Sequence, residues 1–360
     1  MIVPHSRPLI DEEDIKAVTN VLASGYISQG AKVREFETRL AKFIGTKYGV
    51  AVSSGTSALH VALTGLNVGI GDEVIVPSYV CAAPYMAILY AGAIPKIVDV
   101  DPSDFNICAA TVKKEITSKT KAIIVPHMFG TPAELDELLD IGIPIIEDCA
   151  QSLGAEYKKR KAGSFGRLCV CSFYATKMIT AGEGGMVLTN DSEIYTKIIE
   201  VREYDKRPLN TIRYNYKMSD IQAALGLSQL KKLPYFIRRR REIAAIYNEC
   251  FSTSDIILPS INPHKRSVFY RYVVLLDRLK HIQKEAKKRG IIVKKPVWKP
   301  LHKNLASTFK CPNSDYVYNH ALSIPLYPSL AQEEIEYVVK KMKAIFTGNT
   351  LSSENIIDTK

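Results

Sequence analysis

From about residue 45 to residue 190 the chain alternates short β-rich runs with segments of helical periodicity. The β-rich runs are apolar almost throughout, which is typical of strands that are covered on both faces of a sheet. Strands and helices in alternation favour an α/β fold with a mainly parallel sheet between two layers of helices. We expect seven strands, at 48–52, 73–77, 95–100, 121–126, 143–148, 169–173 and 185–190. We expect helices among them at about 56–66, 81–91 and 132–140.

The pattern changes after about residue 217. The helical segment MSDIQAALGLSQLKKL, with Ser219 as its expected N-cap, precedes a second helical run, YFIRRRREIAAIYNECF. Further on we expect a strand within 267–276, a basic helix around 278–289, a strand at 291–294 and a last helix at about 331–346. We therefore predict a large domain over 1–235, a small α+β C-terminal domain over 236–347 and a flexible polar tail over 348–360.

The charge balance narrows the classes of partner. The chain has 360 residues, of which 46% are hydrophobic and 24% charged, and this composition excludes collagen-like and wholly disordered proteins. Its 48 Lys and Arg residues against 37 Asp and Glu residues give a net charge of +11. This excess favours an anionic partner, which could be nucleic acid, a membrane surface, a phosphorylated cofactor or a nucleotide-linked substrate.

Hydropathy and cysteine spacing predict a cytoplasmic protein. No apolar run approaches the roughly 18 to 20 residues that cross a bilayer, and the first residues lack the layout of a secretory signal. The seven cysteines are an odd number, are spread widely and include no C-x-x-C pair. We therefore expect reduced, mostly buried thiols, no disulfide framework and no bound metal.

Ligands of open α/β sheets bind beyond the carboxyl ends of the strands, so residues at those ends are candidates for function. The first candidate is SSGTSALH, at 53–60, where Gly55 permits close backbone approach and Thr56 and Ser57 open a helix. Free N–H groups and hydroxyls at a helix start can cradle a phosphate. The same residues could also serve only as a helix cap.

The second candidate is IIEDCAQS, at 145–152, where an apolar strand ends in Glu147 and Asp148. A buried carboxylate is costly unless it meets a cation or several hydrogen-bond donors. Metal ligation, a general base and an ion pair with a protonated heterocycle all remain open here. Gln151 would lie near Asp148 if the chain turns into a loop or a helix.

The third candidate is CSFYATKMITAGEGGMVLTN, where a strand ends at Ser172 and a short turn carries Lys177. A partly desolvated lysine is a candidate Schiff-base nucleophile, because burial favours the neutral amine. The alternative is a surface lysine in a hairpin-like loop. A fourth segment, NYKMSDIQAAL, places Asn215 and Tyr216 before the helix capped by Ser219 and indicates by itself only a helix start.

Taken in order, these segments resemble the fold-type I pyridoxal-phosphate (PLP) enzymes, and more narrowly the DegT/StrS family of sugar aminotransferases. The resemblance covers nearly the whole chain. It includes GYISQGAKVREFE, GTSALHVAL, GDEVIVPSY, EDCAQSLGAEY, SFYATK, GEGGMV, NYKMSDIQAALGLSQL, KPLH and SIPLY. It implies a seven-stranded, mainly parallel sheet in a large PLP-binding domain and a small C-terminal domain.

The resemblance also implies roles for individual residues. Lys177 would form the Schiff base with PLP and move the proton between cofactor and substrate, as a lysine freed beside the reacting carbon can do. Asp148 would keep the pyridine nitrogen protonated, and Gln151 would lie near the 3-oxygen of the cofactor.

The phosphate of PLP would be bound by Thr56, Ser57 and Ser172. Asn215 would reach the phosphate region from the neighbouring subunit, which implies a homodimer with shared active sites. The sequence departs from the family at Cys81, where an aromatic residue commonly stacks on the cofactor ring. It departs conservatively at Lys217, where the family often has Arg.

The usual reaction of this family transfers an amino group from L-glutamate to a keto carbon of a nucleotide-linked deoxysugar, for surface polysaccharide such as lipopolysaccharide. In KPVWKPLH, Trp298 lies among lysines just before His302, a suitable place for a diphosphate-linked ligand. A basic loop with the indole packed in the domain interface is the alternative. Tyr26 is a further candidate substrate contact. His127 could face the cofactor or serve as a hydrogen-bonded structural histidine.

Two rival functions remain. Some relatives use the scaffold for sugar dehydration, but those enzymes typically carry His in place of Lys177. A basic regulatory or nucleic-acid-binding protein would draw on 238–241 and on the basic residues of 284–289. Four consecutive arginines on a helix point about 100° apart and form no single stripe, and no aromatic platform is interleaved with them. We therefore expect no nucleic acid and no membrane among the partners.

Overall fold

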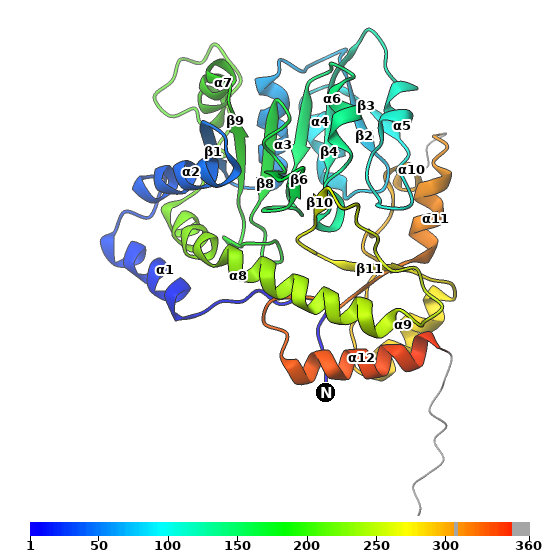
Figure 1. Ribbon diagram of the computed structural model, residues 1–360. Coiled ribbons are helices and arrows are strands. Elements are labelled where there is room, and N and C mark those ends of the chain that lie inside the picture. The colour runs from blue at the N-terminus through cyan, green and yellow to red at the C-terminus, as the bar shows by residue number, and fades with distance from the viewer. Residues whose placement is uncertain (306–308, 348–360) are drawn as a thin grey trace, which may run out of the picture.

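The computed structural model of the protein describes residues 1–305 and 309–347. Its centre is a seven-stranded sheet with the order β1-β9-β8-β5-β4-β2-β3 (Figure 1). The strands are β1 (Tyr48–Val52), β2 (Glu73–Pro77), β3 (Ile94–Val98), β4 (Thr120–Pro126), β5 (Ile145–Asp148), β8 (Leu168–Ser172) and β9 (Gly185–Thr189). β9 runs antiparallel to β1 and β8, and the other neighbours pair in parallel. The seven predicted strands are confirmed.

Successive side chains of these strands enter different cores, because side chains alternate between the faces of a sheet. Val50 and Val52 pack with α3 (Gly55–Gly65) and with part of α4 (Ala82–Tyr90) and α7 (Ser192–Arg202). Ala51, between the two valines, packs in a second core with α2 (Ala31–Ile44) and with the first half of α8 (Asp220–Phe251). A third cluster buries the same sheet under α5 (Ala109–Lys113) and α6 (Leu135–Leu139). The prediction of a sheet covered on both faces is therefore confirmed.

The helix α8 corrects one prediction, because the two expected helical runs form one helix of 32 residues. Its start is capped as expected, with the Ser219 side chain accepting from the N–H of Gln222. Pro234 lies inside this helix without ending it. The helix packs on both sides of that proline, in the large-sheet core through Leu233 and Phe236 and in a separate core beyond Ile243. This packing outweighs the preference of proline for a helix end.

The C-terminal part of the chain builds that separate core around a two-stranded antiparallel sheet, β11 (Tyr272–Leu275) with β12 (Ala321–Ile324). The helices of this part are α9 (Leu279–Lys288), α10 (Leu301–Asn304), α11 (Pro312–His320) and α12 (Gln332–Phe346). The strand expected at 291–294 is wrong. That segment makes isolated bridges to two different partners, Ile291 to Val3 and Lys294 to Ser323, and so forms no ladder.

A small sheet links the two parts of the molecule. β10 (Lys265–Arg266) pairs with β6 (Glu156–Tyr157), which pairs with β7 (Arg160–Lys161). In Figure 1 the segment that carries β10 crosses from the side of β11 to the strands of the large sheet. The remaining elements are α1 (Glu12–Ser24) and the short 3-10 helix η1 (Met128–Gly130). In the described part of the chain, no helix combines the length and the apolar character needed to span a bilayer. The domain boundary predicted near residue 235 falls inside α8 and stays a prediction, and the predicted tail lies outside the described residues.

Candidate active site

Asp148 is the last residue of β5 and lies at the carboxyl end of the sheet. Its side chain is buried, and within the described part of the chain its carboxylate accepts one hydrogen bond, from the N–H of Ala150 at 3.0 Å. Burial raises the pKa of Asp148 above its ordinary value, although the Ala150 N–H and the charge of Lys177 act in the opposite direction. A buried carboxylate with so few donors is suited to receive a cationic or protonated ligand group.

Glu147, one residue earlier, points to the other face of β5 and is fully buried. Its carboxylate accepts from His127 Nε2 at 3.0 Å and from the N–H groups of Gly163, Phe165 and Gly166 at 2.7, 2.7 and 2.6 Å. Burial raises its pKa, but the donated hydrogen bonds and His127 outweigh burial and hold the pKa below its ordinary value. The donors thus satisfy Glu147 within the protein.

His127 holds Glu147 in place. The N–H of Ala133 donates to His127 Nδ1 at 3.1 Å, so the ring hydrogen lies on Nε2 and is donated to Glu147. Both ring nitrogens of this fully buried histidine are therefore engaged by the protein. Of the two roles that the sequence left open, this geometry supports the structural one.

The start of α3 forms a cradle at the end of β8. Ser54 is the N-cap and accepts from the N–H of Ser57 at 3.0 Å, while the hydroxyls of Ser54 and Ser57 lie 2.9 Å apart. A Cβ at Gly55 would lie 2.8 Å from the Cβ of Ser172, so only glycine lets the helix start approach this strand end. Among the described residues the N–H groups of Gly55 and Thr56 have no acceptor, which suits a phosphate at a helix N-terminus.

Lys177 lies in the loop between β8 and β9 and is half-buried, with its backbone N–H donating to the carbonyl of Tyr174 at 2.9 Å. Its Nζ lies 5.4 Å from the ring centroid of the buried Tyr270, and its charge acts on Asp148 and on the thiol of Cys81. Cys81 itself is exposed to solvent. Lys177 is therefore close enough to Asp148 and Cys81 for its charge to act on both, and it is no isolated surface lysine.

Gln151 and Asn215 border the same region. The side-chain oxygen of Gln151 accepts from the N–H of Phe129 at 3.0 Å, which turns its amide nitrogen to other partners. Asn215 is exposed, and the carbonyl of its neighbour Tyr216 accepts from the N–H of Ser53 beside the cradle at 2.8 Å. Asn215 is thus one residue away from a backbone contact with the segment before the cradle, and it is exposed to solvent.

The three predicted substrate contacts differ in their surroundings. Tyr26 is 83% exposed and lines a cavity of about 610 Å³ between α1 and α2, and Trp298 is 79% exposed. The indole is therefore not packed in a domain interface of the described chain. His302 is buried, with Nδ1 2.6 Å from Ser78 Oγ and Nε2 3.2 Å from Asp315. Among residues 1–305 and 309–347 no hydrogen bond, ion pair or ring contact joins these three residues to Lys177.

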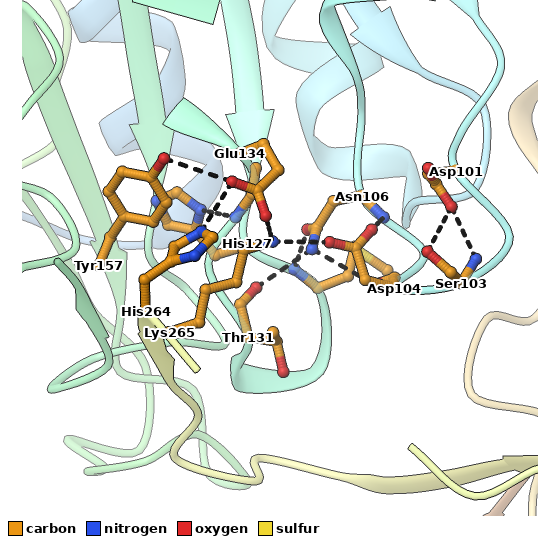
Figure 2. A network of polar contacts seen from close by, with 12 residues as sticks. Asp101, Ser103, Asp104, Asn106, His127, Thr131, Glu134, Tyr157, His264 and Lys265 are labelled. Carbon is orange, nitrogen blue, oxygen red and sulfur yellow. Dashed lines mark hydrogen bonds and ion pairs between the residues drawn. The ribbon is translucent and has the colours of Figure 1, made fainter. Parts of the chain in front are cut away.

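Sequence reasoning missed the segment 264–271, which fastens the C-terminal part to the loops that follow β3 and β4. The buried Lys265 contacts Asp104 at 3.0 Å and Glu134 at 2.8 Å, and His264 Nε2 contacts Glu134 at 2.9 Å (Figure 2). Further along, the Ser267 hydroxyl donates to the carbonyl of Gly130 at 3.0 Å. The apolar run SVFYRYVVLL predicted a strand here, but no local pattern identifies contacts across more than 100 residues.

The comparisons with known proteins agree with this geometry. A family model described as the DegT/DnrJ/EryC1/StrS aminotransferase family matches residues 8–343. GDP-perosamine synthase of Escherichia coli O157:H7 is 32% identical, over 96% of this chain and 99% of that protein. Spore coat polysaccharide biosynthesis protein SpsC of Bacillus subtilis strain 168 is 34% identical, over 96% and 97%. A Streptococcus pneumoniae protein named as a sugar aminotransferase, in its PLP form, has a TM-score of 0.91 at 28% identity, over 97% and 100%.

The fold and the site define a PLP-dependent aminotransferase of fold-type I. The chain belongs to the DegT/DnrJ/EryC1/StrS aminotransferase family and is a PLP-dependent sugar aminotransferase. The residues fit the cofactor, because the buried Asp148 has one donor and the Gly55 cradle would be filled by a Cβ. The predicted family, fold class and cofactor are confirmed.

Proposed function

We propose that the protein transfers an amino group from L-glutamate to a keto carbon of a nucleotide-linked deoxysugar. The product would enter surface polysaccharide or glycoconjugate synthesis, lipopolysaccharide included, in the cytoplasm. The observation that carries the proposal is a half-buried Lys177 whose charge acts on Asp148, a buried carboxylate at the end of β5 that accepts from the N–H of Ala150 alone among the described residues. The name of the E. coli relative, GDP-perosamine synthase, supports a nucleotide-linked sugar.

Each site residue then has a defined task. Bound PLP supplies an electron sink beside the carbon that exchanges its amino group. Asp148 would hold a proton on the ring nitrogen, and the Lys177 amine would bind the cofactor and carry the proton at the reacting carbon. The phosphate would lie at the start of α3 against Thr56, Ser57 and Ser172, and Gln151 would meet the 3-oxygen.

The active site of this proposal needs two copies of the chain. Asn215 is exposed, as a side chain that reaches a neighbouring subunit must be. Tyr26 and Trp298 are exposed as well, and would contact the sugar or nucleotide in the homodimer. His302 would act by holding its loop on Ser78 at the end of β2, since both its ring nitrogens contact protein side chains.

The rival functions have less support. Lys177 favours transamination over dehydration. The four arginines of α8 diverge as expected: Arg240 is buried, Arg241 donates to the carbonyl of Ser267, Arg239 donates to the carbonyl of Leu330 and Arg238 pairs with Glu242. A side-chain arrangement of this kind offers a polyanion no continuous stripe.

The test is an amine-transfer assay of the PLP-loaded protein, with L-glutamate and a panel of nucleotide-linked 3-keto and 4-keto sugars. Lys177→Ala should lose the visible absorbance of the bound cofactor and all turnover. Lys231→Ala, an exposed lysine of α8, is the matched control and should retain both. Turnover by Lys177→Ala, or no transfer to any sugar by the unaltered protein, would contradict the proposal.

A further inference from the structure

Two cations lie near the ring of the buried Tyr270, and a third, Arg240, donates to the carbonyl of the same residue. Lys177 Nζ lies 5.4 Å from the ring centroid of Tyr270, and the guanidinium carbon of Arg271 lies 5.2 Å from the same centroid. With Arg240, these charges and a hydrogen bond with Thr176 hold the pKa of Tyr270 below its ordinary value, although burial raises it. Positive charge is thus concentrated at this point of the interior.

No carboxylate neutralises this cluster. Across residues 1–305 and 309–347, neither Lys177 nor Arg240 nor Arg271 lies within ion-pair distance of an Asp or Glu side chain. Like charges in a partly desolvated site repel one another, and removing them from water is costly. An anion that enters this site would therefore be bound favourably.

The guanidinium of Arg240 is hydrogen-bonded to backbone carbonyls. Its Nη1 donates to the carbonyls of Phe269, Tyr270 and Leu326, at 3.3, 3.1 and 3.1 Å. Its side chain is buried, and burial lowers its pKa to about 10. Arg240 therefore fixes the junction between α8, the segment before β11 and the segment after β12, and leaves Arg271 as the guanidinium that can receive a ligand.

Arg271 is anchored without being neutralised. Its Nη1 contacts the ring nitrogens of His5 at 3.2 and 3.3 Å, and His5 Nε2 also lies 2.9 Å from the hydroxyl of Ser323. Burial, with Arg271 and Lys294 nearby, lowers the pKa of His5 to about 3, so this ring is a neutral acceptor at physiological pH. The half-buried guanidinium thus has a fixed position and, among the described residues, no carboxylate partner.

We infer that Arg271 binds a carboxylate of the amino donor and so positions the donor for the amine of Lys177. The inference rests on the proposed function, in which the donor reacts at the amine of Lys177. A guanidinium matches a carboxylate with two parallel hydrogen bonds. The contact of both cations with the Tyr270 ring places this subsite next to the reacting centre.

The experiment compares Arg271→Met and Arg271→Lys with Arg238→Met, a matched change at an exposed arginine outside the site. The first probe is glutarate, which has two carboxylates and no amine, titrated calorimetrically into the PLP-loaded proteins. We expect Arg271→Met to weaken glutarate binding by about 10- to 100-fold, Arg271→Lys by less, and Arg238→Met not at all. Equal glutarate affinity in all variants would overturn the inference.

A second measurement identifies the carboxylate. The first half-reaction is followed by cofactor absorbance with L-glutamate and with L-alanine, which lacks the side-chain carboxylate. If Arg271→Met slows L-glutamate alone, Arg271 binds the side-chain carboxylate; if it slows both donors, Arg271 binds the carboxylate on the reacting carbon. If Arg271→Met weakens only the binding of the keto sugar and leaves the reaction of both donors unchanged, the inference is overturned. Failure of the unaltered protein to use L-glutamate contradicts the proposed function, whereas glutarate binding still tests Arg271.

Discussion

Glu147 and Asp148 are adjacent and both buried. They differ in the face of β5 from which they project, in the number of hydrogen-bond donors they meet and in the direction in which their pKa is shifted. Glu147 lies on one face of β5 and is satisfied by His127 and three backbone N–H groups. Asp148 lies on the other face and accepts from one backbone N–H. Burial penalises both carboxylates, yet the pKa of Glu147 is lowered and that of Asp148 is raised. The number of donors, and not burial, separates a structural carboxylate from one that awaits a ligand.

The loss of Glu147 should produce the largest effect. Glu147→Ala leaves His127 and the N–H groups of Gly163, Phe165 and Gly166 without their acceptor inside the protein. We expect the free energy of unfolding to fall by about 3–5 kcal/mol, the usual result of removing one partner from a buried charged network. Glu137→Ala, at an exposed site of α6, is the control for denaturant unfolding. A loss below about 1 kcal/mol would refute the structural role.

Asp148→Asn should lower the activity without lowering the stability. The amide removes a costly buried charge, so the free energy of unfolding of the cofactor-free protein should stay equal or rise. Transamination should fall by about 10²–10³-fold, as when a group that stabilises transition-state charge is removed. Asp140→Asn, at an exposed position, should change neither quantity. Strong destabilisation with normal activity would reverse the assignment of the two carboxylates.

Glu147 and Asp148 also show which properties of the site can be predicted from the sequence and which cannot. An apolar strand that ends in two acids predicted a carboxylate at the carboxyl end of the sheet, because strand direction and strand ends are local properties. The pattern could not distinguish the two residues, since the donors of Glu147 come from Gly163, Phe165 and Gly166, beyond the next turn. The sequence did not predict that α8 is continuous or where Arg271 lies, because tertiary packing decides both.

Two glycine substitutions give smaller effects of different kinds. A Cβ at Gly166 would lie 2.8 Å from the carbonyl oxygen of Ile145 and 3.2 Å from Cγ of Glu147, so Gly166→Ala crowds the structural side. Gly55→Ala crowds the cradle at Ser172. We expect about 1–3 kcal/mol of destabilisation for Gly166→Ala, and chiefly weaker PLP affinity for Gly55→Ala.

The control for both substitutions is Gly69→Ala, where a Cβ meets no atom within 4 Å. Unfolding of the cofactor-free proteins measures the first effect, and PLP titration measures the second. Equal losses of stability in Gly166→Ala and Gly55→Ala, with PLP affinity unchanged, would show that the cradle is only a packing contact.

The smallest effect should appear in the pH dependence of stability, where protonation changes the charge of each carboxylate and leaves its side chain in place. The pKa of Glu147 in the folded protein lies below its ordinary value of 4.5. Its contribution to stability is therefore present above pH 4.5 and is lost as the pH falls through the folded pKa. The advantage of the unaltered protein over Glu147→Gln should shrink on acidification.

The contribution of Asp148 to stability depends on pH in the opposite direction. Its folded pKa lies above its ordinary value of 3.8, so its contribution is present below pH 3.8 and is lost as the pH rises through the folded pKa. Relative to Asp148→Asn, the unaltered cofactor-free protein should therefore lose stability as the pH rises. Denaturant unfolding of the three proteins from about pH 3 to pH 8 measures both differences. The two measured quantities are the stability of the unaltered protein relative to Glu147→Gln and relative to Asp148→Asn. If both change with pH in the same direction, the donors do not shift the pKa values of the two carboxylates in opposite directions, and the distinction between the two faces of β5 fails.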